Sequence, residues 1–310
     1  MSSEKRLNFA IVGCGRIAQR HAEHIKRFGR LVATCDLDLE RAATLAKEHD
    51  AHSFTHLEEM LAEKADEIDL VAVCTPNGLH AEHTIMAFEA GCHVLCEKPL
   101  AISVVECGQM IISSERANRR LFVVKQNRYN PPVQAVKELL DNGTLGRIFS
   151  VHLNCFWNRR ESYYKESWKG SNTMDGGCLY TQFSHFIDLL YWMVGDVRAV
   201  TGLTNNYCHE KCVEFEDSGV FAVEFYNGAM GSIAFTVNSH KKNMEGSLTL
   251  FCEKGTVKIG GQYLNELEYQ NIDGYHIDGL PEGRPANQYG HYQGSMSNHD
   301  LVYENVVSVL

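Results

Sequence analysis

The sequence predicts two domains: an α/β Rossmann domain with a doubly wound parallel sheet over residues 1–126, and an α+β domain with a mostly antiparallel open sheet over residues 127–310. Three observations support this division. Short apolar runs alternate with helical stretches up to residue 124, paired prolines follow at Pro131 and Pro132, and strand patterns then succeed one another. A length of 310 residues with 44% hydrophobic content is enough for two buried cores.

Within the first domain, an apolar run over 7–13 predicts a strand, and the helical period of 17–28 predicts the helix after it. Because the strands are almost continuously apolar and alternate with helices, we expect a parallel sheet. The further strands are expected near 31–35, 70–74, 94–96 and 121–124. The further helices are expected near 39–49, 57–63, 79–90 and 103–118.

The second domain is predicted to begin where Asn127 to Pro132 break regular structure. Helices are expected over 133–141 and 178–194, and Asn227-Gly228 is a hairpin signal between two strand patterns. The expected strands lie near 147–156, 198–206, 219–226 and 229–237. The final amphipathic pattern reaches Leu310 without a C-cap, so whether the natural chain continues past it stays open.

Composition excludes several classes of function. The chain carries 29 Lys and Arg against 39 Asp and Glu, a net charge of −10, which disfavours nucleic acid as a partner. No apolar run approaches the length that spans a bilayer, so no membrane partner is expected. The eleven cysteines are odd in number and contain no C-x-x-C, and the N-terminus lacks a signal sequence, which predicts reduced thiols in a cytoplasmic protein. Two Cys-His clusters, at 92–96 and 208–212, lack the paired spacing of a structural zinc site, and no metal is expected.

The segment Gly13-Cys14-Gly15-Arg16-Ile17-Ala18 reads G-x-G-x-x-A between the first predicted strand and helix. At such a turn, backbone N–H groups and the helix dipole hold a pyrophosphate, which makes Gly13, Gly15, Arg16 and Ile17 candidate cofactor residues. Asp36 ends the second predicted strand, 23 residues after Gly13, where a carboxylate accepts from ribose hydroxyls and repels a 2′-phosphate. NAD is therefore preferred over NADP, with a turn or cap role for Asp36 as the alternative.

Two further motifs lie at carboxyl ends of predicted strands, where doubly wound folds bind ligands. Thr75-Pro76-Asn77 follows the strand at 70–74, although a simple turn would also explain it. Glu97-Lys98-Pro99 follows the strand at 94–96 and places an amine beside the expected nicotinamide, where a hydroxyl that is oxidised must lose a proton. Lys98 is therefore the first candidate for the catalytic base, against the alternative of a solvated lysine at a strand end.

In the second domain, Gly176-Gly177 precedes an apolar helical pattern that contains Thr181, Gln182 and His185. Thr181 and His185 are four residues apart, so we expect them on one face of a helix. A histidine in such a helix is either a satisfied core residue or a catalytic one, and the Gly-Gly turn favours catalysis. Upstream lies a basic, aromatic segment that either binds an anionic ligand or forms a solvated loop. Its members are Trp157, Arg159, Arg160, Tyr163, Tyr164, Trp168 and Lys169.

These motifs together, with His80 after Thr75-Pro76-Asn77, resemble the glucose-fructose oxidoreductase and inositol dehydrogenase family over essentially the whole chain. The segments Lys125-Gln126-Asn127-Arg128-Tyr129-Asn130-Pro131-Pro132 and Thr181-Gln182-Phe183-Ser184-His185-Phe186 are similar to the bacterial UDP-N-acetylglucosaminuronate 3-dehydrogenases, which make amino-sugar precursors of surface polysaccharides. Many members of the family carry aspartate four residues before the active-site histidine, whereas this chain has Thr181 there. Since His185 then lacks an evident carboxylate partner, the proton-accepting role shifts toward Lys98.

The resemblance implies an NAD-dependent dehydrogenase that oxidises the 3-hydroxyl of a nucleotide-linked N-acetylhexosaminuronate to a 3-keto sugar, with the proton passing to Lys98 or His185. It also implies a homotetramer or homodimer formed through the open face of the second sheet. A dehydrogenase of a simple sugar or inositol and a non-catalytic nucleotide-sensing regulator stay open as alternatives. Besides the glycine motif, the implied cofactor residues are Asp36, Thr75, Pro76, Asn77, His80, Glu97, Lys98, Gln126 and Trp168. The implied substrate residues are Arg128, Arg159, Arg160, Lys169, Thr181, Gln182 and His185.

Overall fold

The computed structural model describes residues 6–165, 168–288 and 293–310, which fall into two compact units. Unit 1 holds the chain up to Val124 together with Thr173–Asp175 and His299–Leu310. Unit 2 holds Lys125–Asn172 and Gly176–Asn298. The first division therefore falls after Val124, close to the boundary predicted after residue 126.

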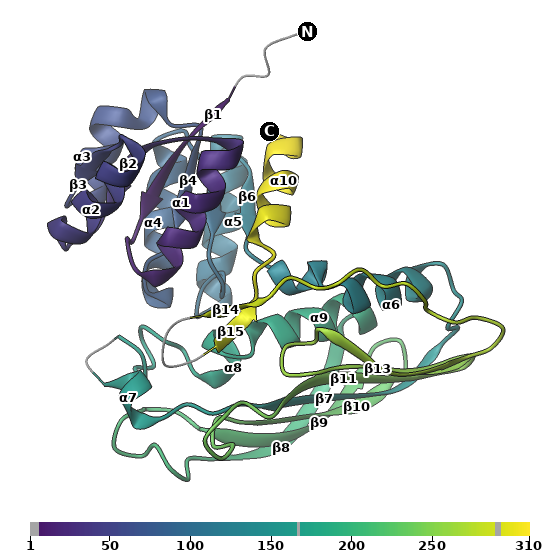
Figure 1. The fold of residues 1–310 in the computed structure, drawn as a ribbon. Helices are drawn as coiled ribbons and strands as arrows, with labels where there is room; N and C mark the ends of the chain where they lie inside the picture. The colour runs from purple at the N-terminus through teal and green to yellow at the C-terminus, as the bar shows by residue number, and fades with distance from the viewer. Residues whose placement is uncertain (1–5, 166–167, 289–292) are drawn as a thin grey trace, which may run out of the picture. The chain divides into compact units, whose positions relative to one another are not determined.

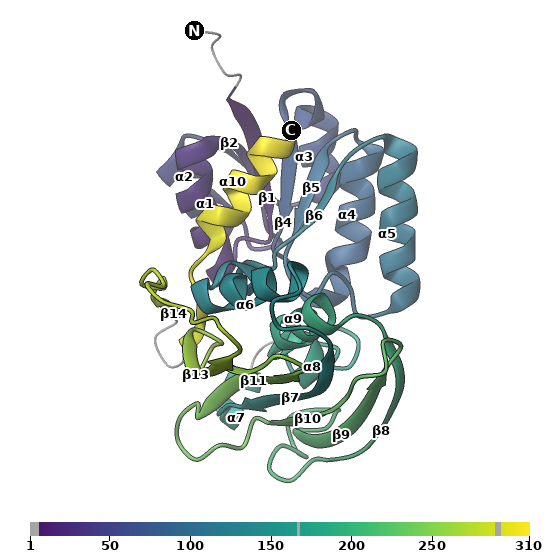
Figure 2. The same ribbon diagram turned by 90° about the vertical axis from the view of Figure 1, so that its right-hand side faces the viewer.

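A six-stranded parallel sheet forms the centre of unit 1, in the order β3-β2-β1-β4-β5-β6 (Figures 1 and 2). The strand order reverses between β1 and β4, and this switch point is where doubly wound sheets bind ligands. The strands are β1 (Leu7–Val12), β2 (Gly29–Cys35), β3 (His52–Phe54), β4 (Leu70–Val73), β5 (His93–Cys96) and β6 (Leu121–Val123). The helices are α1 (Arg16–Phe28), α2 (Leu39–His49), α3 (Leu57–Lys64), α4 (His80–Glu89), α5 (Val104–Ala117) and α10 (His299–Val309), with 3-10 turns η1 (Ala65–Glu67) and η2 (Asn77–Leu79).

The prediction of a Rossmann domain for unit 1 is confirmed. The helices of this unit bury the faces and carry the caps that their sequences favour. Helix α1 buries Ala18, Ala22 and Ile25, whose spacing of three and four residues puts them on one face. Helix α5 begins with a capping box in which the Ser103 and Glu106 side chains bond each other's backbone N–H. Strand β3 was missed, because three residues are too few to show a period.

Helix α10 corrects the predicted domain assignment. The sequence places residues 299–309 in the second domain, whereas the structure packs α10 against α1 in unit 1 (Figure 1). Val302, Tyr303 and Val306 are buried there, at the helical spacing expected of one apolar face. The periodicity predicted the helix but could not identify its partner, which lies more than 270 residues earlier in the chain.

Unit 2 is built on a seven-stranded sheet in the order β13-β12-β11-β7-β10-β9-β8, antiparallel throughout except for the parallel pair β7 and β10. This confirms the predicted α+β class. The strands β7 to β10 were predicted, and β11 to β15 were not. The strands are β7 (Ile148–Phe156), β8 (Val197–Asn205), β9 (Ser218–Phe225), β10 (Met230–Thr236), β11 (Glu245–Cys252), β12 (Gly255–Gly260) and β13 (Glu266–Ile272), with a separate pair β14 (Ala286–Gln288) and β15 (Gln293–Met296).

Helices cover one face of the seven-stranded sheet, where Figures 1 and 2 show α6, α8 and α9. On β7, Val151, Leu153 and Cys155 are buried and alternate with less buried residues, the period expected of a strand with one covered face. Strand β8, at one edge of the sheet, is exposed along its whole length. The helices of this unit are α6 (Pro131–Asp141), α7 (Glu161–Tyr164), α8 (Cys178–Thr181) and α9 (Ser184–Val194), with the 3-10 turn η3 (Gln126–Tyr129).

The single helix predicted over 178–194 is two helices, which corrects the geometry assumed for Thr181 and His185. Helix α8 ends at Thr181, and α9 starts at Ser184 after Phe183 leaves the helical region with φ −111° and ψ 8°. Phe183 is fully buried, so its side chain enters the core at the break. The argument that Thr181 and His185 share one helix face therefore fails.

All eleven cysteines are free thiols, as predicted. Burial raises the pKa of several, including Cys14 and Cys35 to about 12. Within the described ranges, no helix is both long and apolar enough to cross a membrane.

Candidate active site

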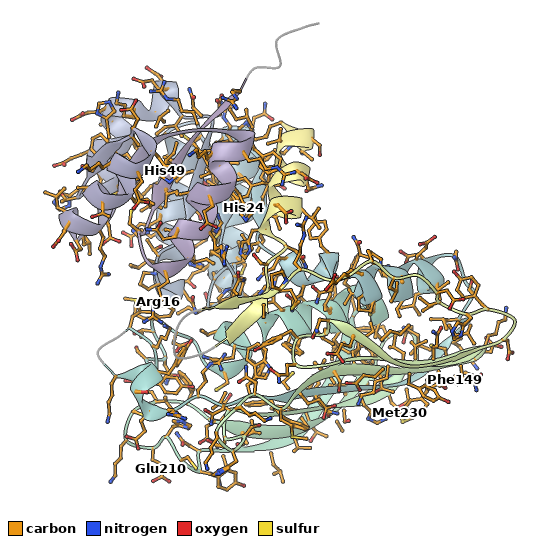
Figure 3. The ribbon with its side chains drawn as sticks, viewed as in Figure 1. Arg16, His24, His49, Phe149, Glu210 and Met230 are labelled. Atoms are coloured by element: carbon orange, nitrogen blue, oxygen red, sulfur yellow. The ribbon has the colours of Figure 1, made fainter. Side chains whose placement is uncertain are left out.

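The turn between β1 and α1 brings three strand ends together around Gly13. Its φ is +86°, and a Cβ added there would stand 2.7 Å from backbone atoms of Cys74 and Thr75, so only glycine fits. Gly15 is the N-cap of α1, with open space where a side chain would stand and no side-chain cap on the helix. No side chain caps the first turn of α1, the part of a helix whose N–H groups bind an anion; Arg16, its first residue, is labelled in Figure 3.

Asp36 is fixed beside this turn at the end of β2. Its Oδ2 accepts the Cys14 N–H at 2.7 Å, and its Oδ1 accepts the Asp38 N–H at 2.9 Å. The second contact is the turn role considered as the alternative, and the first anchors the carboxylate against the glycine turn. Each oxygen keeps a lone pair for a further donor, so the turn role and ribose binding are compatible.

The loop after β4 is held by Asn77, which is 5% exposed and donates from Nδ2 to the Asp175 carbonyl at 2.8 Å. Gly78 N–H donates to the Met174 carbonyl at 3.1 Å. These two bonds tie Thr173–Asp175 to unit 1. Asn77 thus supports the loop from inside, leaving Thr75 and Pro76 as its more accessible members.

His80 has a bracing role that the sequence did not predict. It is 1% exposed, and its ring nitrogens lie 2.7 Å from the Pro99 carbonyl and 2.9 Å from the Thr75 carbonyl. Burial lowers the pKa of His80, although both carbonyls favour the charged ring. The imidazole therefore joins the loop after β4 to the loop after β5, and its engaged nitrogens argue against the direct cofactor contact expected for it.

Glu97 and Lys98 follow β5, with Glu97 buried and Lys98 half-buried. Glu97 Oε1 lies 3.0 Å from His21 Nε2, and Oε2 accepts the Lys98 N–H at 3.0 Å. Burial opposes the charge of Glu97, but the hydrogen bond from His21 and the nearby His299 ring outweigh it and hold the pKa of this carboxyl well below its usual value. Both carboxylate oxygens thus face protein groups, which favours support of Lys98 over the predicted cofactor contact.

In unit 2, the Gly-Gly turn leads into α8, with Gly176 at φ +85° and Gly177 at φ +118°. Side chains other than glycine rarely adopt these angles, so the glycines set how the chain enters α8. Thr181, Gln182 and His185 follow and are 8%, 3% and 2% exposed. The structure thus gathers the predicted residues of this segment, although on two helices.

Arg159 is the buried cation of unit 2, at 5% exposed. Its Nη1 donates to the Asn158 carbonyl at 2.7 Å and to Asn243 Oδ1 at 3.2 Å, and its guanidinium stands 5.0 Å from the Trp157 ring and 5.3 Å from the Tyr163 ring. These contacts fix the planar guanidinium of Arg159, which can donate two parallel hydrogen bonds, between polar groups and aromatic rings.

The same aromatic cluster links Arg159 to the segment that carries His185. Trp157 packs against Phe183 and Phe186, with ring centroids 5.2 and 5.5 Å apart. Gln182 Nε2 donates to the Tyr163 hydroxyl at 3.4 Å. The end of β7 and the start of α9 are therefore parts of one packed cluster.

The other predicted cations have different surroundings. Arg128 makes a bidentate pair with Asp188, at 2.7 and 2.8 Å, and stacks on Trp192, so structural contacts occupy it. Arg160 is exposed, and Lys169 Nζ lies 4.5 Å from the Tyr163 ring centroid and 5.4 Å from that of Trp168. Gln126 is buried in η3, where its carbonyl accepts from Asn298 Nδ2 at 3.2 Å.

Several contributors to this cluster escaped sequence reasoning. His209 contacts the Arg159 carbonyl through Nε2 at 2.9 Å and Asp217 through Nδ1 at 3.0 Å, so a buried pair fixes the Arg159 backbone. Asn243 bonds both Arg159 and the Tyr263 hydroxyl, the latter at 3.2 Å. No motif marks these residues, because they enter the cluster from loops that lie far apart in the sequence.

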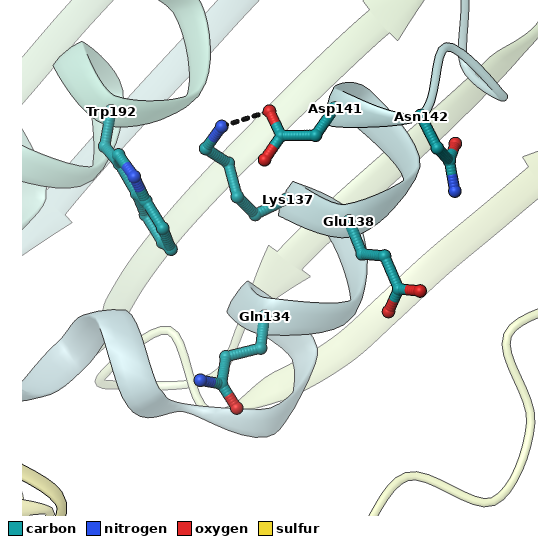
Figure 4. Close-up of a pocket in the computed structure, with 6 residues that line it drawn as sticks. All are labelled: Gln134, Lys137, Glu138, Asp141, Asn142 and Trp192. Carbon is teal, nitrogen blue, oxygen red and sulfur yellow. Dashed lines mark hydrogen bonds and ion pairs between the residues drawn. The ribbon is translucent and has the colours of Figure 1, made fainter. Parts of the chain in front are cut away.

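A hollow on the surface of unit 2 is lined by Trp192, on which Arg128 stacks, but by none of the candidate residues themselves (Figure 4). Lys137 pairs with Asp141 there and stands 5.3 Å from the Trp192 ring centroid. None of the residues that line the hollow was predicted for the site. No anion-binding turn lies among these lining residues. We assign it no catalytic role. The lining residues are Gln134, Lys137, Glu138, Asp141, Asn142 and Trp192.

Comparison with protein families decides the class of this protein. Residues 7–125 match the oxidoreductase family with an NAD-binding Rossmann fold, and residues 133–258 match the GFO/IDH/MocA C-terminal domain. The chain belongs to the GFO/IDH/MocA family. It is an NAD-dependent sugar oxidoreductase, as the motifs predicted.

Two solved structures resemble the chain over most of its length. The WlbA dehydrogenase of Chromobacterium violaceum, in complex with NADH and UDP-GlcNAcA, is 33% identical with a TM-score of 0.89, over 99% of this chain and 86% of that one. The WlbA dehydrogenase of Bordetella pertussis, with the same two ligands, is 38% identical with a TM-score of 0.84, over 89% and 80%. The D-glucoside 3-dehydrogenase of Escherichia coli is 37% identical over 147 residues, 46% of this chain and 41% of that protein.

Unit 1 of this family member fits NAD. The glycine turn leaves space at Gly15 and uncapped N–H groups for a pyrophosphate, and Asp36 lies beside them for a ribose. When bound, the nicotinamide accepts the hydride from the substrate carbon. The protein's own residues must orient that carbon and receive the hydroxyl proton.

Proposed function

We propose that this enzyme oxidises the 3-hydroxyl of UDP-N-acetylglucosaminuronate to a 3-keto sugar. The observation that carries this proposal is the likeness to two dehydrogenases whose structures hold NADH and UDP-GlcNAcA, at 33% and 38% identity over most of both chains. In the reaction, the C3–H bond breaks as hydride leaves to NAD, and the O–H bond breaks as its proton passes to a protein base. The carbon is oxidised by two electrons, and NAD is reduced by the same two.

We assign the proton to Lys98, with His185 as the second candidate. Lys98 follows β5, the neighbour of β4, at the edge of the parallel sheet where the strands' carboxyl ends lie and where doubly wound folds bind their ligands. His185 is buried at the start of α9, and the residue four positions earlier is Thr181, which offers no carboxylate to raise its basicity. Thr181 and Gln182 are assigned to substrate hydroxyls.

The acidic substrate requires a local cation, because the whole chain carries a net charge of −10. Arg159 is best suited to this task, since it is buried and held by aromatic rings and an amide. A guanidinium binds a carboxylate or phosphate through two parallel hydrogen bonds. Lys169, beside Tyr163, is assigned to the diphosphate, and exposed Arg160 to a weaker outer contact.

Substrate competition tests the proposal. Initial rates of NADH formation are measured with UDP-N-acetylglucosaminuronate, UDP-N-acetylglucosamine, methyl glucoside and inositol. We expect the nucleotide uronate to have the highest kcat/KM. If methyl glucoside or inositol is oxidised faster, the second candidate, a dehydrogenase of simple sugars, takes its place, as the relation to D-glucoside 3-dehydrogenase allows. Turnover of any of these sugars excludes the non-catalytic regulator.

We also infer a homodimer or homotetramer formed through the open face of the second sheet. On this face Leu203 of β8 stands beside Val220 of β9, and Met230 of β10 lies in register with Ser150 of β7. Leu203, Val220 and Met230, the last of which is labelled in Figure 3, are 81%, 61% and 64% exposed, which makes an apolar surface suited to a partner. The free thiols further support a cytoplasmic location. Sedimentation of the wild type and of Leu203→Glu measures the assembly.

A further inference from the structure

A row of buried polar side chains links the C-terminal helix to Lys98 within unit 1. Tyr303 of α10 and His21 of α1 are 0% exposed, and Glu97 is 6% exposed. Tyr303 Oη lies 2.8 Å from His21 Nδ1, and His21 Nε2 lies 3.0 Å from Glu97 Oε1. Glu97 Oε2 accepts the Lys98 N–H at 3.0 Å. The four residues form one continuous chain of hydrogen bonds.

The protons of this row have one consistent arrangement. Burial raises the pKa of Tyr303 well above its usual value, so its phenol keeps a proton to donate. Burial lowers the pKa of His21, which favours a ring with a single N–H over the charged ring. Glu97 is ionised and can only accept. Tyr303 therefore donates to His21 Nδ1, and His21 donates from Nε2 to Glu97.

Two further histidine rings pack beside this row. His299 of α10 is 1% exposed, with Nε2 3.6 Å from Glu97 Oε1 and its ring edge-on to His21 at 5.7 Å. His24 of α1, labelled in Figure 3, stacks on His299 with ring centroids 6.3 Å apart. Because Glu97 is buried, little water can reach it to replace its hydrogen bonds to His21 and Lys98.

The same atoms could also hold a metal ion, since single ligand atoms of His21, Glu97 and His299 lie within 4.8 Å of one another. A metal ion bound at His21 Nε2 would displace the proton that His21 donates to Glu97. The remaining ring proton would then lie on Nδ1, and His21 would donate to the Tyr303 hydroxyl instead of accepting from it. The hydrogen-bonded row needs no ion, because each of its donors already meets an acceptor. The observed 3.0 Å between His21 and Glu97 is an ordinary hydrogen-bond length.

We propose that Glu97, His21 and Tyr303 are positioning residues that fix the Lys98 backbone for proton transfer. The inference rests on the proposed catalytic role of Lys98. A small displacement of the catalytic base slows proton transfer strongly, because the donor and acceptor atoms must be close and aligned. The C-terminal helix, through Tyr303, thereby becomes part of the catalytic machinery of unit 1.

A double-mutant cycle tests this coupling through kcat. Tyr303→Phe removes one hydroxyl while keeping the ring that packs on Phe9 and Phe28. We expect it to lower kcat about three- to tenfold, and Glu97→Gln to lower it about ten- to a hundredfold, with KM for NAD unchanged in both. Because both act through one row, the double variant should be no slower than Glu97→Gln alone. Multiplied losses in the double variant would contradict a single row.

Ser114→Ala provides the matched structural control. Ser114 is buried in α5 of the same unit and donates its hydroxyl to the Ile111 carbonyl at 2.8 Å, with no link to Lys98. It should leave kcat unchanged whatever it does to the unfolding midpoint. If Tyr303→Phe behaves like Ser114→Ala, Tyr303 has only a structural role and the inference is wrong.

Lys98→Met separates this inference from the proposed function. If Lys98→Met retains normal turnover, the catalytic role of Lys98 fails, whatever the other variants show. If Lys98→Met loses turnover while Tyr303→Phe and Glu97→Gln keep it, only the positioning role fails. In the Lys98→Met background, Tyr303→Phe should cause no further loss. One tightly bound metal ion per chain in the purified enzyme, lost together with activity on chelation, would replace the hydrogen-bonded row with a metal site.

Discussion

The two units hold their candidate residues in different ways. In unit 1, the backbone makes the site, through the turn at Gly13, the start of α1 and the loops that His80 joins. In unit 2, side chains make it, with Arg159 and Gln182 brought together around aromatic rings. A backbone site appears in the sequence as glycines at fixed spacing, whereas a side-chain site depends on contacts between distant segments.

The predicted cations show this difference most clearly. Arg128, Arg159, Arg160 and Lys169 look equivalent in the sequence, yet Arg128 is paired with Asp188 and Arg159 is buried among rings. Arg160 is exposed. Residue type alone therefore cannot assign the anion site, because burial and partners decide which charge a ligand can reach.

Replacement of Lys98 gives the largest expected effect and tests the chemistry assigned to unit 1. Lys98→Met removes the proton acceptor but leaves the glycine turn and Asp36 in place. We expect kcat to fall roughly 10²- to 10⁴-fold, with the dissociation constant for NAD nearly unchanged. Stopped-flow rates and NAD titration measure the two quantities. Near-normal turnover would move the catalytic assignment to His185 in unit 2.

The second prediction contrasts two neighbouring arginines of unit 2. Arg159→Ala should raise KM for UDP-N-acetylglucosaminuronate about ten- to a hundredfold, since a charge-assisted bond in a desolvated site contributes about 1.5 to 3 kcal/mol. KM for neutral UDP-N-acetylglucosamine should change less. Arg160→Ala removes only the exposed outer contact and should therefore raise either KM by no more than about twofold.

The midpoint of thermal unfolding of Arg159→Ala must be measured as well as KM, because Arg159 packs on Trp157 and Tyr163 and its loss can also destabilise the fold. If the variant is folded and its KM rises equally for both UDP-sugars, Arg159 binds the nucleotide or has a structural role. It would then leave the uronate carboxylate to another residue.

The third prediction concerns cofactor choice in unit 1. Asp36→Ala should weaken NAD binding roughly tenfold and narrow its advantage over NADP, because the carboxylate both binds ribose and repels a 2′-phosphate. Asp38→Ala is the matched control. Asp38 caps α2 two residues later, so its loss should cost about 1 kcal/mol of stability without changing the NAD to NADP ratio. Titration of both cofactors measures the effect, and an unchanged ratio in Asp36→Ala would confine Asp36 to its turn role.

The sequence predicted most of unit 1 and less of unit 2, for physical reasons. Parallel strands buried on both faces are continuous apolar runs, and glycine at φ +86° admits few substitutes, so β1, α1 and the glycine turn are visible locally. Strands β11 to β13 alternate weakly, and only β11 pairs with β7, about 90 residues earlier in the chain, while β12 and β13 add to it in turn. The break at Phe183, the bracing by His80 and the packing of α10 on α1 are tertiary effects that no local period encodes.

The smallest expected effect on activity belongs to Arg128, and it tests whether a predicted substrate cation is structural. Arg128 and Asp188 form a bidentate pair that is only partly exposed, and the guanidinium stacks on Trp192. Arg128→Lys keeps the charge but loses the two parallel bonds, and should lower the free energy of unfolding by about 1 to 3 kcal/mol. Asp188→Asn should cost a similar amount, and the double variant less than the sum of the two. Because these contacts lie within unit 2 and already occupy the guanidinium, KM for the nucleotide uronate should stay within about twofold in Arg128→Lys. A large rise in KM without loss of stability would return Arg128 to the substrate site and weaken the contrast drawn with Arg159.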